Sequence, residues 1–97
     1  MNCENLGNVY FDLGDFHRSK KYYERALVIK KSSLPKDSPD IALTLNNIGN
    51  VCKSQKEVEK AKKCYEDCLS ILYSKFGKDS DNPTIATSLG NLGLVYK

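Results

Sequence analysis

The sequence contains no tryptophan and only one histidine and one methionine among its 97 residues. It has no apolar run long enough to span a membrane and no signal segment with a basic start and an apolar centre. It has no glycosylation sequon either, since Asn82-Pro83-Thr84 carries a proline in the middle position. Neither period-two alternation nor an Asn-Gly or Asp-Gly pair indicates a hairpin. These absences argue against membrane, secreted and β-rich proteins, and we expect a cytoplasmic, all-α chain.

Charge of one sign is not in large excess. Lys and Arg (15) against Asp and Glu (12) give a formal net charge of +3, and the two signs are mixed along the chain. A nucleic-acid-binding surface usually gathers basic residues on one face. We therefore expect no nucleic-acid partner and no membrane partner, and the length allows one domain with a modest core.

Residues that could carry catalysis are sparse. His17 stands beside Arg18, with no nucleophile or carboxylate at a suitable spacing. Leu6-Gly7-Asn8 and Leu13-Gly14-Asp15 do not follow strands, as phosphate-binding glycine loops do. The sequence therefore predicts no enzyme and no cofactor.

The four cysteines are open to a metal or redox interpretation and to a packing interpretation; they are Cys3, Cys52, Cys64 and Cys68. Cys64 and Cys68 are four residues apart, but two thiolates fall short of the four ligands of a structural zinc site. Buried cysteine behaves as a small apolar residue. We interpret the cysteines as core residues and predict no metal site.

An internal repeat decides the fold class. Three segments read alike, and their glycines, Gly7, Gly49 and Gly93, stand 42 and 44 residues apart. The two additional residues fall in a loop, where an insertion disturbs a helical frame least. The likeness continues at the 42-residue offset in Lys20/Lys62, Lys21/Lys63, Tyr23/Tyr65, Glu24/Glu66, Leu27/Leu69, Ile29/Ile71 and Ser32/Ser74. Periods of this length are typical of helical solenoids.

Each unit contains two helical patterns. Ile41, Leu45, Ile48 and Cys52 fall at spacings of four, three and four, which is one face of a helix. Ser38-Pro39 and Asn82-Pro83 each place a capping side chain before a proline, whereas Gly14 and Gly77 mark helix ends. The patterns predict five helices, over roughly 2–13, 16–33, 39–54, 57–76 and 83–97. One such pair cannot bury its own apolar face, so neighbouring pairs must stack.

The spacing resembles the tetratricopeptide repeat, whose first helix carries Leu-Gly-x-x-Tyr and whose second carries Ala-x-x-x-Phe. The matching segments are Leu6-Gly7-x-x-Tyr10 with Ser19-x-x-x-Tyr23, then Ile48-Gly49-x-x-Cys52 with Ala61-x-x-x-Tyr65, and finally Leu92-Gly93-x-x-Tyr96. The long period and the loop from Asp37 to Ala42 are similar to the kinesin-light-chain subtype. The resemblance implies a right-handed α–α superhelix in one domain, 1–97. Repeat 1 would cover 1–38, repeat 2 would cover 39–82, and 83–97 would be the first helix of a truncated third.

Two departures from this pattern lead to further expectations. The repeated glycines lie inside helices, where glycine costs about 0.8–1 kcal/mol relative to alanine, so we expect close helix approach at each. Lys56 stands where the first unit has Gly14. If the turn requires a positive φ there, lysine is strained by roughly 1 kcal/mol; otherwise the second turn has a different shape.

The third unit lacks its second helix. An apolar stripe on its first helix would then remain without a full cover, and the stripe consists of Leu89, Leu92, Val95 and Tyr96. Self-association through this uncovered helix, giving a homo-oligomer, is therefore an alternative to ligand binding.

The resemblance also implies where a ligand would lie, because tetratricopeptide arrays line a concave groove with the first helix of each repeat. In the first unit these positions are Glu4, Asn5, Asn8 and Asp12. The second unit contributes Leu43, Asn46, Asn47, Asn50, Lys53 and Ser54, and the third contributes Thr87, Gly90, Asn91 and Leu94.

Asparagines recur among these positions although asparagine is a poor helix former. A side-chain amide offers donors and an acceptor, so the row could hold the backbone of an extended peptide. The same amides could instead join neighbouring helices. A clamp for a terminal carboxylate does not fit, since Glu4 is acidic and no cation follows Asn91 before Lys97. We expect a protein-interaction scaffold that binds an extended internal segment of a partner protein.

Overall fold

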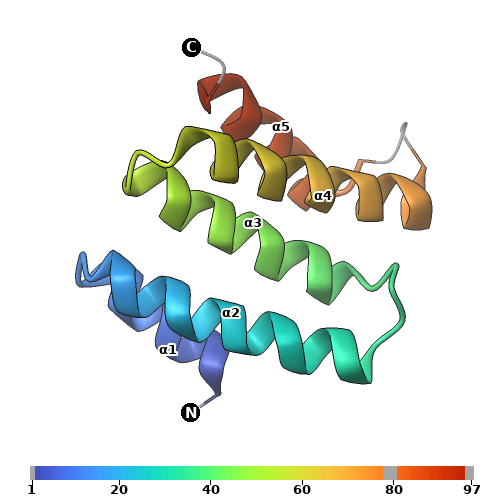
Figure 1. Ribbon diagram of the computed structural model, residues 1–97. Helices are drawn as coiled ribbons and strands as arrows, with labels where there is room; N and C mark the ends of the chain where they lie inside the picture. Colours follow the sequence, from blue (N-terminus) through green and yellow to red (C-terminus); the bar gives the residue numbers. More distant parts are fainter. Residues whose placement is uncertain (1, 78–80, 96–97) are drawn as a thin grey trace.

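The computed structural model describes residues 2–77 and 81–95, with the side chain of Val95 excepted. Within these residues the chain forms helices and no strands. The helices are α1 (Cys3–Asp12), α2 (Phe16–Ser33), α3 (Pro39–Ser54), α4 (Val58–Phe76) and α5 (Pro83–Val95) (Figure 1). The all-α prediction is confirmed, and the helix ends agree with the predicted ones within one residue. The predicted end of the last helix at 97 lies outside the described residues.

Side-chain caps explain where four of the described helices begin; α4 has no such cap. The Asn2 side chain accepts from the Asn5 amide at 2.8 Å, and the Asp15 side chain accepts from the Arg18 amide at 3.2 Å. At the two capped prolines, Ser38 accepts from Asp40 N and Asn82 accepts from Thr84 N, at 3.3 and 2.8 Å. Each contact satisfies one of the amides that a first turn leaves without a helical partner.

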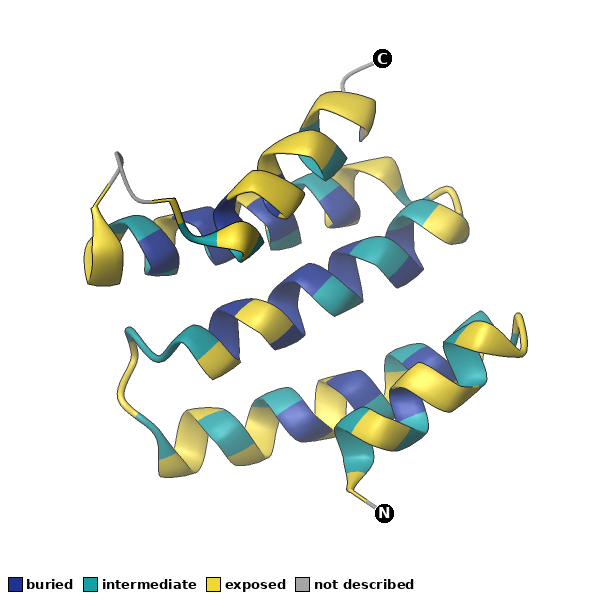
Figure 2. Ribbon diagram, turned by 180° about the vertical axis from the view of Figure 1, so that it is seen from behind, coloured by how far each residue is buried: buried dark blue, intermediate teal, exposed yellow. Residues whose placement is uncertain are grey.

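The helices pack as consecutive antiparallel neighbours. α1 packs on α2, α2 on α3, α3 on α4 and α4 on α5, and α3 also contacts α5. Seen from behind, α1 and α5 lie in front of α2 and α4 (Figure 2). Among the described helices, none is long and apolar enough to cross a membrane.

The core is centred on α3, which has a neighbour on more sides than any other helix. One buried cluster joins Ile41 and Leu45 of α3 to Leu72 of α4 and Ile85 of α5. The other cluster comprises Tyr23, Ile48, Val51, Cys52, Ala61 and Tyr65. Cys52 and Cys68 are 1% and 0% exposed, as the packing interpretation predicts.

The glycines inside the helices make room for tyrosine rings. A Cβ built on Gly7 would lie 2.6 Å from the Tyr23 ring, and one on Gly49 would lie 2.7 Å from the Tyr65 ring. The expectation of a close approach is therefore correct at these two positions, although a side-chain ring, and not a second backbone, occupies the space. At Gly93 the expectation is wrong, because a Cβ there would meet nothing within 4 Å.

The turns inside the two units share one backbone shape. Gly14 has φ of 81° and Lys56 has φ of 63°, so lysine occupies the left-handed region that glycine fills in the first unit. The strained alternative is thus the right one, and a differently shaped second turn is excluded. The longer connection begins at Gly77, with φ of 87° at the end of α4.

The last helix is covered on one side only. Leu89 is 48% exposed, which agrees with an uncovered stripe. Leu92 departs from that expectation, since it is half-buried and packs against both core clusters. Tyr96 and the side chain of Val95, the other two predicted members of the stripe, lie outside what is described.

Candidate functional site

The predicted groove residues divide by exposure. Six are exposed on the first helices of the units: Asn5, Asn8, Asp12, Leu43, Thr87 and Leu94. Another four are half-buried: Asn47, Asn50, Lys53 and Asn91. Of the remaining positions, Glu4 is half-buried, whereas Ser54 and Gly90 are exposed.

Asn46 requires a correction. This residue is 4% exposed and lies between α3 and α5, so it does not line an open surface. Its Oδ1 accepts a hydrogen bond from Ser88 Oγ at 2.9 Å and a longer one from Asn91 Nδ2 at 3.5 Å. Cys68 Sγ lies 3.2 Å from Ser88 Oγ and extends this buried polar chain to α4. Asn46 therefore joins helices, because a buried amide must find its partners inside the protein.

A charged network also joins helices, in this case α1, α2 and α3. Lys30 Nζ lies 2.6 Å from Glu4 Oε2 and donates to Thr44 Oγ1 at 2.9 Å. Glu4 Oε1 accepts from Thr44 Oγ1 at 3.1 Å and from Asn47 Nδ2 at 3.4 Å. Glu4 is thus engaged inside the molecule, and it fixes the position of Asn47.

Two further asparagines bond to Tyr23 and Tyr65, the tyrosines whose rings fill the space over Gly7 and Gly49. The Tyr23 hydroxyl donates to Asn8 Oδ1, and the Tyr65 hydroxyl donates to Asn50 Oδ1 at 2.6 Å. Burial, together with the nearby Glu4 and Asp12 carboxylates, raises the pKa of Tyr23 to about 12. Burial likewise raises the pKa of Tyr65 above its ordinary range.

The asparagine row is therefore largely an internal framework. Asn91 Nδ2 donates to Asn50 Oδ1 at 3.1 Å, so α5 is tied to α3 at a second point beside Asn46. Within the described residues, the Asn5 side chain has no hydrogen-bond partner and points a complete amide outward. Of the two uses left open by the sequence, helix joining has contacts at Asn8, Asn46, Asn47, Asn50 and Asn91.

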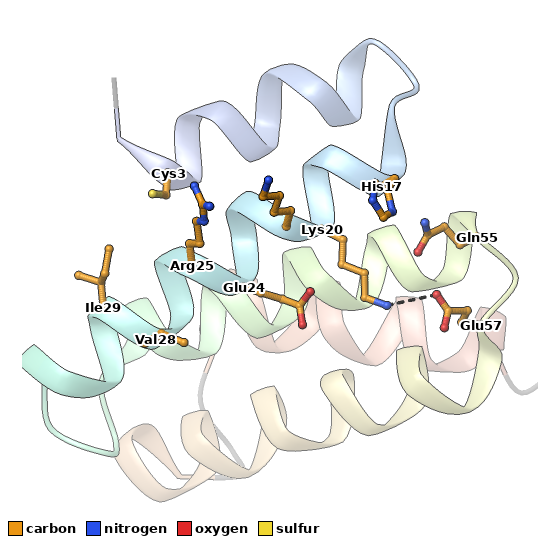
Figure 3. A pocket seen from close by; sticks show the side chains of 10 residues that line it. Cys3, His17, Lys20, Glu24, Arg25, Val28, Ile29, Gln55 and Glu57 are labelled. Atoms are coloured by element: carbon orange, nitrogen blue, oxygen red, sulfur yellow. Dashed lines mark hydrogen bonds and ion pairs between the residues drawn. The ribbon is translucent and has the colours of Figure 1, made fainter.

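A cleft on the opposite side of the molecule was not predicted. It has a volume of about 930 Å³ and lies along the outer face of α2, next to the turn between α3 and α4 (Figure 3). Val28 and Ile29 line it and are 65% and 57% exposed. Lys20 reaches from α2 toward Glu57, with its Nζ 3.2 Å from Oε1. Two adjacent apolar residues on a polar helix face were the signal that could have indicated this cleft.

No three-residue group of His, Cys, Asp and Glu that could hold a metal ion occurs within residues 2–77 and 81–95. The exposed side of α1, α3 and α5 and the cleft along α2 both carry hydrogen-bonding and apolar groups, which are the groups that contact a bound peptide or protein.

Comparison with known proteins identifies the family of these stacked helix pairs. The family model of the tetratricopeptide repeat matches residues 1–74. The chain belongs to the tetratricopeptide-repeat family. No curated protein sequence shows a significant match to it.

A solved structure supports the subtype. The crystal structure of BtubC (BKLC) from P. vanneervenii is similar to this tetratricopeptide protein, with a TM-score of 0.86 and 26% sequence identity. The match covers 97% of this chain and 36% of BtubC, so the chain spans well under half the length of that protein. The two comparisons together show a tetratricopeptide protein of kinesin-light-chain type. Membership in this family indicates a protein–protein interaction scaffold.

Proposed function

We propose that this tetratricopeptide protein binds an extended internal segment of a partner protein across the outward surface of α1, α3 and α5. The observation that carries the proposal is the set of hydrogen bonds that ties these helices together. Thr44 and Asn47 of α3 bond to Glu4 of α1, and Asn91 of α5 bonds to Asn50 of α3. A surface fixed before binding loses less conformational freedom when a peptide docks.

The exposed side chains on these helices suit a segment with apolar residues. Leu43 is 42% exposed and Leu94 is 56% exposed, and each offers an apolar contact on a different helix. Asn5 and Thr87 supply polar groups nearby on the first and last of the three helices, and Asp12 and Lys53 carry opposite charges. This mixture favours a ligand held by its main chain and by a few apolar side chains, with little net charge.

The proposal treats the chain as one domain with two helix pairs, 1–38 and 39–82, followed by the first helix of a third pair, 83–97. It also takes the protein to be cytoplasmic. It assigns no catalytic residue and no cofactor, and it includes no nucleic-acid or membrane partner. The family comparison supports a non-catalytic scaffold in general terms.

A peptide-display selection with two matched variants tests the surface. Leu43→Ala with Leu94→Ala removes the exposed apolar contacts of α3 and α5, whereas Val28→Ala with Ile29→Ala removes an equal number from α2. Exposed substitutions of this kind change stability by no more than about 0.5 kcal/mol. We expect the wild type to select peptides that the first variant loses and the second retains. The proposal fails if no peptide is selected, if both variants retain the peptides, or if only the second loses them.

Self-association through α5 is a second candidate function, favoured by the exposure of Leu89 and by the open space over Gly90 and Gly93. Light scattering over a range of concentrations distinguishes the two. A dimer that Leu89→Lys dissociates would support self-association. A monomer at every concentration would eliminate it.

A further inference from the structure

Two cysteines from neighbouring helices of the second unit lie side by side. Cys52 on α3 is 1% exposed, and Cys64 on α4 is half-buried. Cys64 packs against the buried cluster that contains Cys52. Both line one cleft of about 390 Å³ between α2 and α4, and neither is in a disulfide.

The first unit shows that this pairing follows from the fold. Tyr10 and Tyr22 stand 42 residues before Cys52 and Cys64, at the same positions of the repeat. Their rings are stacked, with centroids 5.5 Å apart and planes within 7° of parallel. The helix pair therefore brings these two positions face to face in both units, with two rings in the first and two thiols in the second.

Lysine side chains line the thiol cleft, together with Glu24 and Glu59. Lys20 from α2 and Lys60 from α4 both reach Glu57, at 3.2 and 2.9 Å, and both line the cleft (Figure 3 shows Lys20 and Glu57). The neighbouring Cys64 thiol, helped by Lys20 and Lys60, lowers the pKa of Cys52 to about 7, against the effects of burial and of the Glu57 carboxylate. The Cys52 thiol and burial raise the pKa of Cys64 well above its ordinary range. A thiol whose pKa is lowered, beside a second thiol, is the arrangement that oxidation to a disulfide requires.

We propose that Cys52 and Cys64 form a peroxide-sensitive thiol pair that closes into a disulfide between α3 and α4. The Cys52 thiolate attacks one oxygen of hydrogen peroxide and becomes a sulfenic acid, while the O–O bond breaks and the leaving hydroxide takes up a proton as water. The Cys64 sulfur then attacks the Cys52 sulfur and forms the S–S bond. The displaced hydroxide takes the Cys64 proton and leaves as a second water. Two thiols lose two electrons and two protons, and one peroxide is reduced to two waters.

The other two cysteines are placed differently. Cys68 is 0% exposed and lies against Ser88, and burial raises its pKa. Cys3 lies near the beginning of α1 and lines the cleft on the outer face of α2. The nearly complete burial of Cys52 also selects for a small oxidant, because a bulky disulfide such as oxidised glutathione cannot reach its sulfur.

The test is a hydrogen-peroxide titration of the reduced wild-type chain, followed by mass spectrometry without reduction. Digestion with trypsin and a Glu-specific protease cuts after Glu66 and so separates Cys64 from Cys68. We expect a monomer that has lost two hydrogen atoms and yields a peptide pair linked through Cys52 and Cys64. Its melting temperature should rise by on the order of 10 °C, since the disulfide restricts the unfolded chain, and dithiothreitol should reverse the rise.

Two matched variants serve as controls. Cys64→Ser should abolish the linked peptides, whereas Cys68→Ser should leave them unchanged. The proposal is overturned if peroxide produces no link, joins Cys52 to Cys3 or Cys68, or gives only linked dimers. It is also overturned if oxidised glutathione forms the link as fast as peroxide does.

Discussion

The contact between Gly49 and Tyr65 leads to a prediction with a definite sign. An alanine Cβ at position 49 would lie 2.7, 2.9 and 3.0 Å from three atoms of the Tyr65 ring, closer than packed atoms tolerate. The ring cannot withdraw easily, because Tyr65 is 0% exposed and its hydroxyl is bonded to Asn50 at 2.6 Å. Either the tyrosine or α3 itself must therefore shift.

The magnitude follows from two opposing effects. Alanine gains about 0.8–1 kcal/mol over glycine inside a helix. Overpacking a filled site costs typically 1–3 kcal/mol. Gly49→Ala should therefore lower the free energy of unfolding by about 1 kcal/mol. Gly90→Ala is the matched control, since a Cβ there meets nothing within 4 Å, and it should raise that free energy by up to about 1 kcal/mol.

Urea and thermal unfolding of the two variants beside the wild type measure the difference. One kcal/mol corresponds to a melting-temperature change of roughly 4–8 °C for a chain of this size, so the opposite shifts are resolvable. In a Tyr65→Leu background the penalty of Gly49→Ala should shrink or change sign, because the ring is absent. If Gly49→Ala is as stabilising as Gly90→Ala in the wild-type background, the Tyr65 ring does not restrict packing over Gly49, and our account of the repeated glycine is wrong.

Three further predictions test the turns, the charged network and the buried hydroxyls. Lys56→Gly should raise the unfolding free energy by up to about 1 kcal/mol, since φ of 63° strains lysine, and an unchanged urea midpoint would contradict that strain. A double-mutant cycle of Glu4→Gln and Lys30→Met should show coupling of about 1 kcal/mol, and additive effects would mean that their 2.6 Å contact does not stabilise the fold. The raised pKa of Tyr23, about 12, means that the folded state retains a proton that an unfolded tyrosine releases near pH 10. Stability should therefore be intact below about pH 10 and fall as the pH rises toward about 12, and Tyr23→Phe should lessen the fall in a urea series; an equal fall in both proteins would refute this origin.

Local rules explain why much of the fold could be predicted. The capping side chains of Ser38 and Asn82 and the stop at Gly77 act through their own backbone neighbourhoods, so the sequence alone indicates where those helices begin and end. The repeat at a 42-residue offset adds the requirement that pairs stack, because an isolated pair leaves an apolar face exposed. These features together indicate the tetratricopeptide family.

The candidate site was predicted less completely, since a helix position does not reveal which partner a polar side chain meets. Asn5 and Asn47 occupy equivalent positions in the two units, yet the side chain of Asn5 is exposed and that of Asn47 donates to Glu4. Asn46 follows the groove pattern in sequence, but the approach of Ser88 on α5 buries it. The thiol pair escaped prediction for a similar reason, because Cys52 and Cys64 meet only when α3 and α4 are packed.

By itself, the sequence determined the helices, their limits, the repeat and the family, because capping, helical periodicity and repetition are properties of the chain taken in order. Only the tertiary structure decided which amides tie the helices together, what fills the space over Gly7 and Gly49, and which cysteines face each other. Those outcomes depend on contacts between residues far apart in sequence, where the packing of whole helices sets the distance between two side chains.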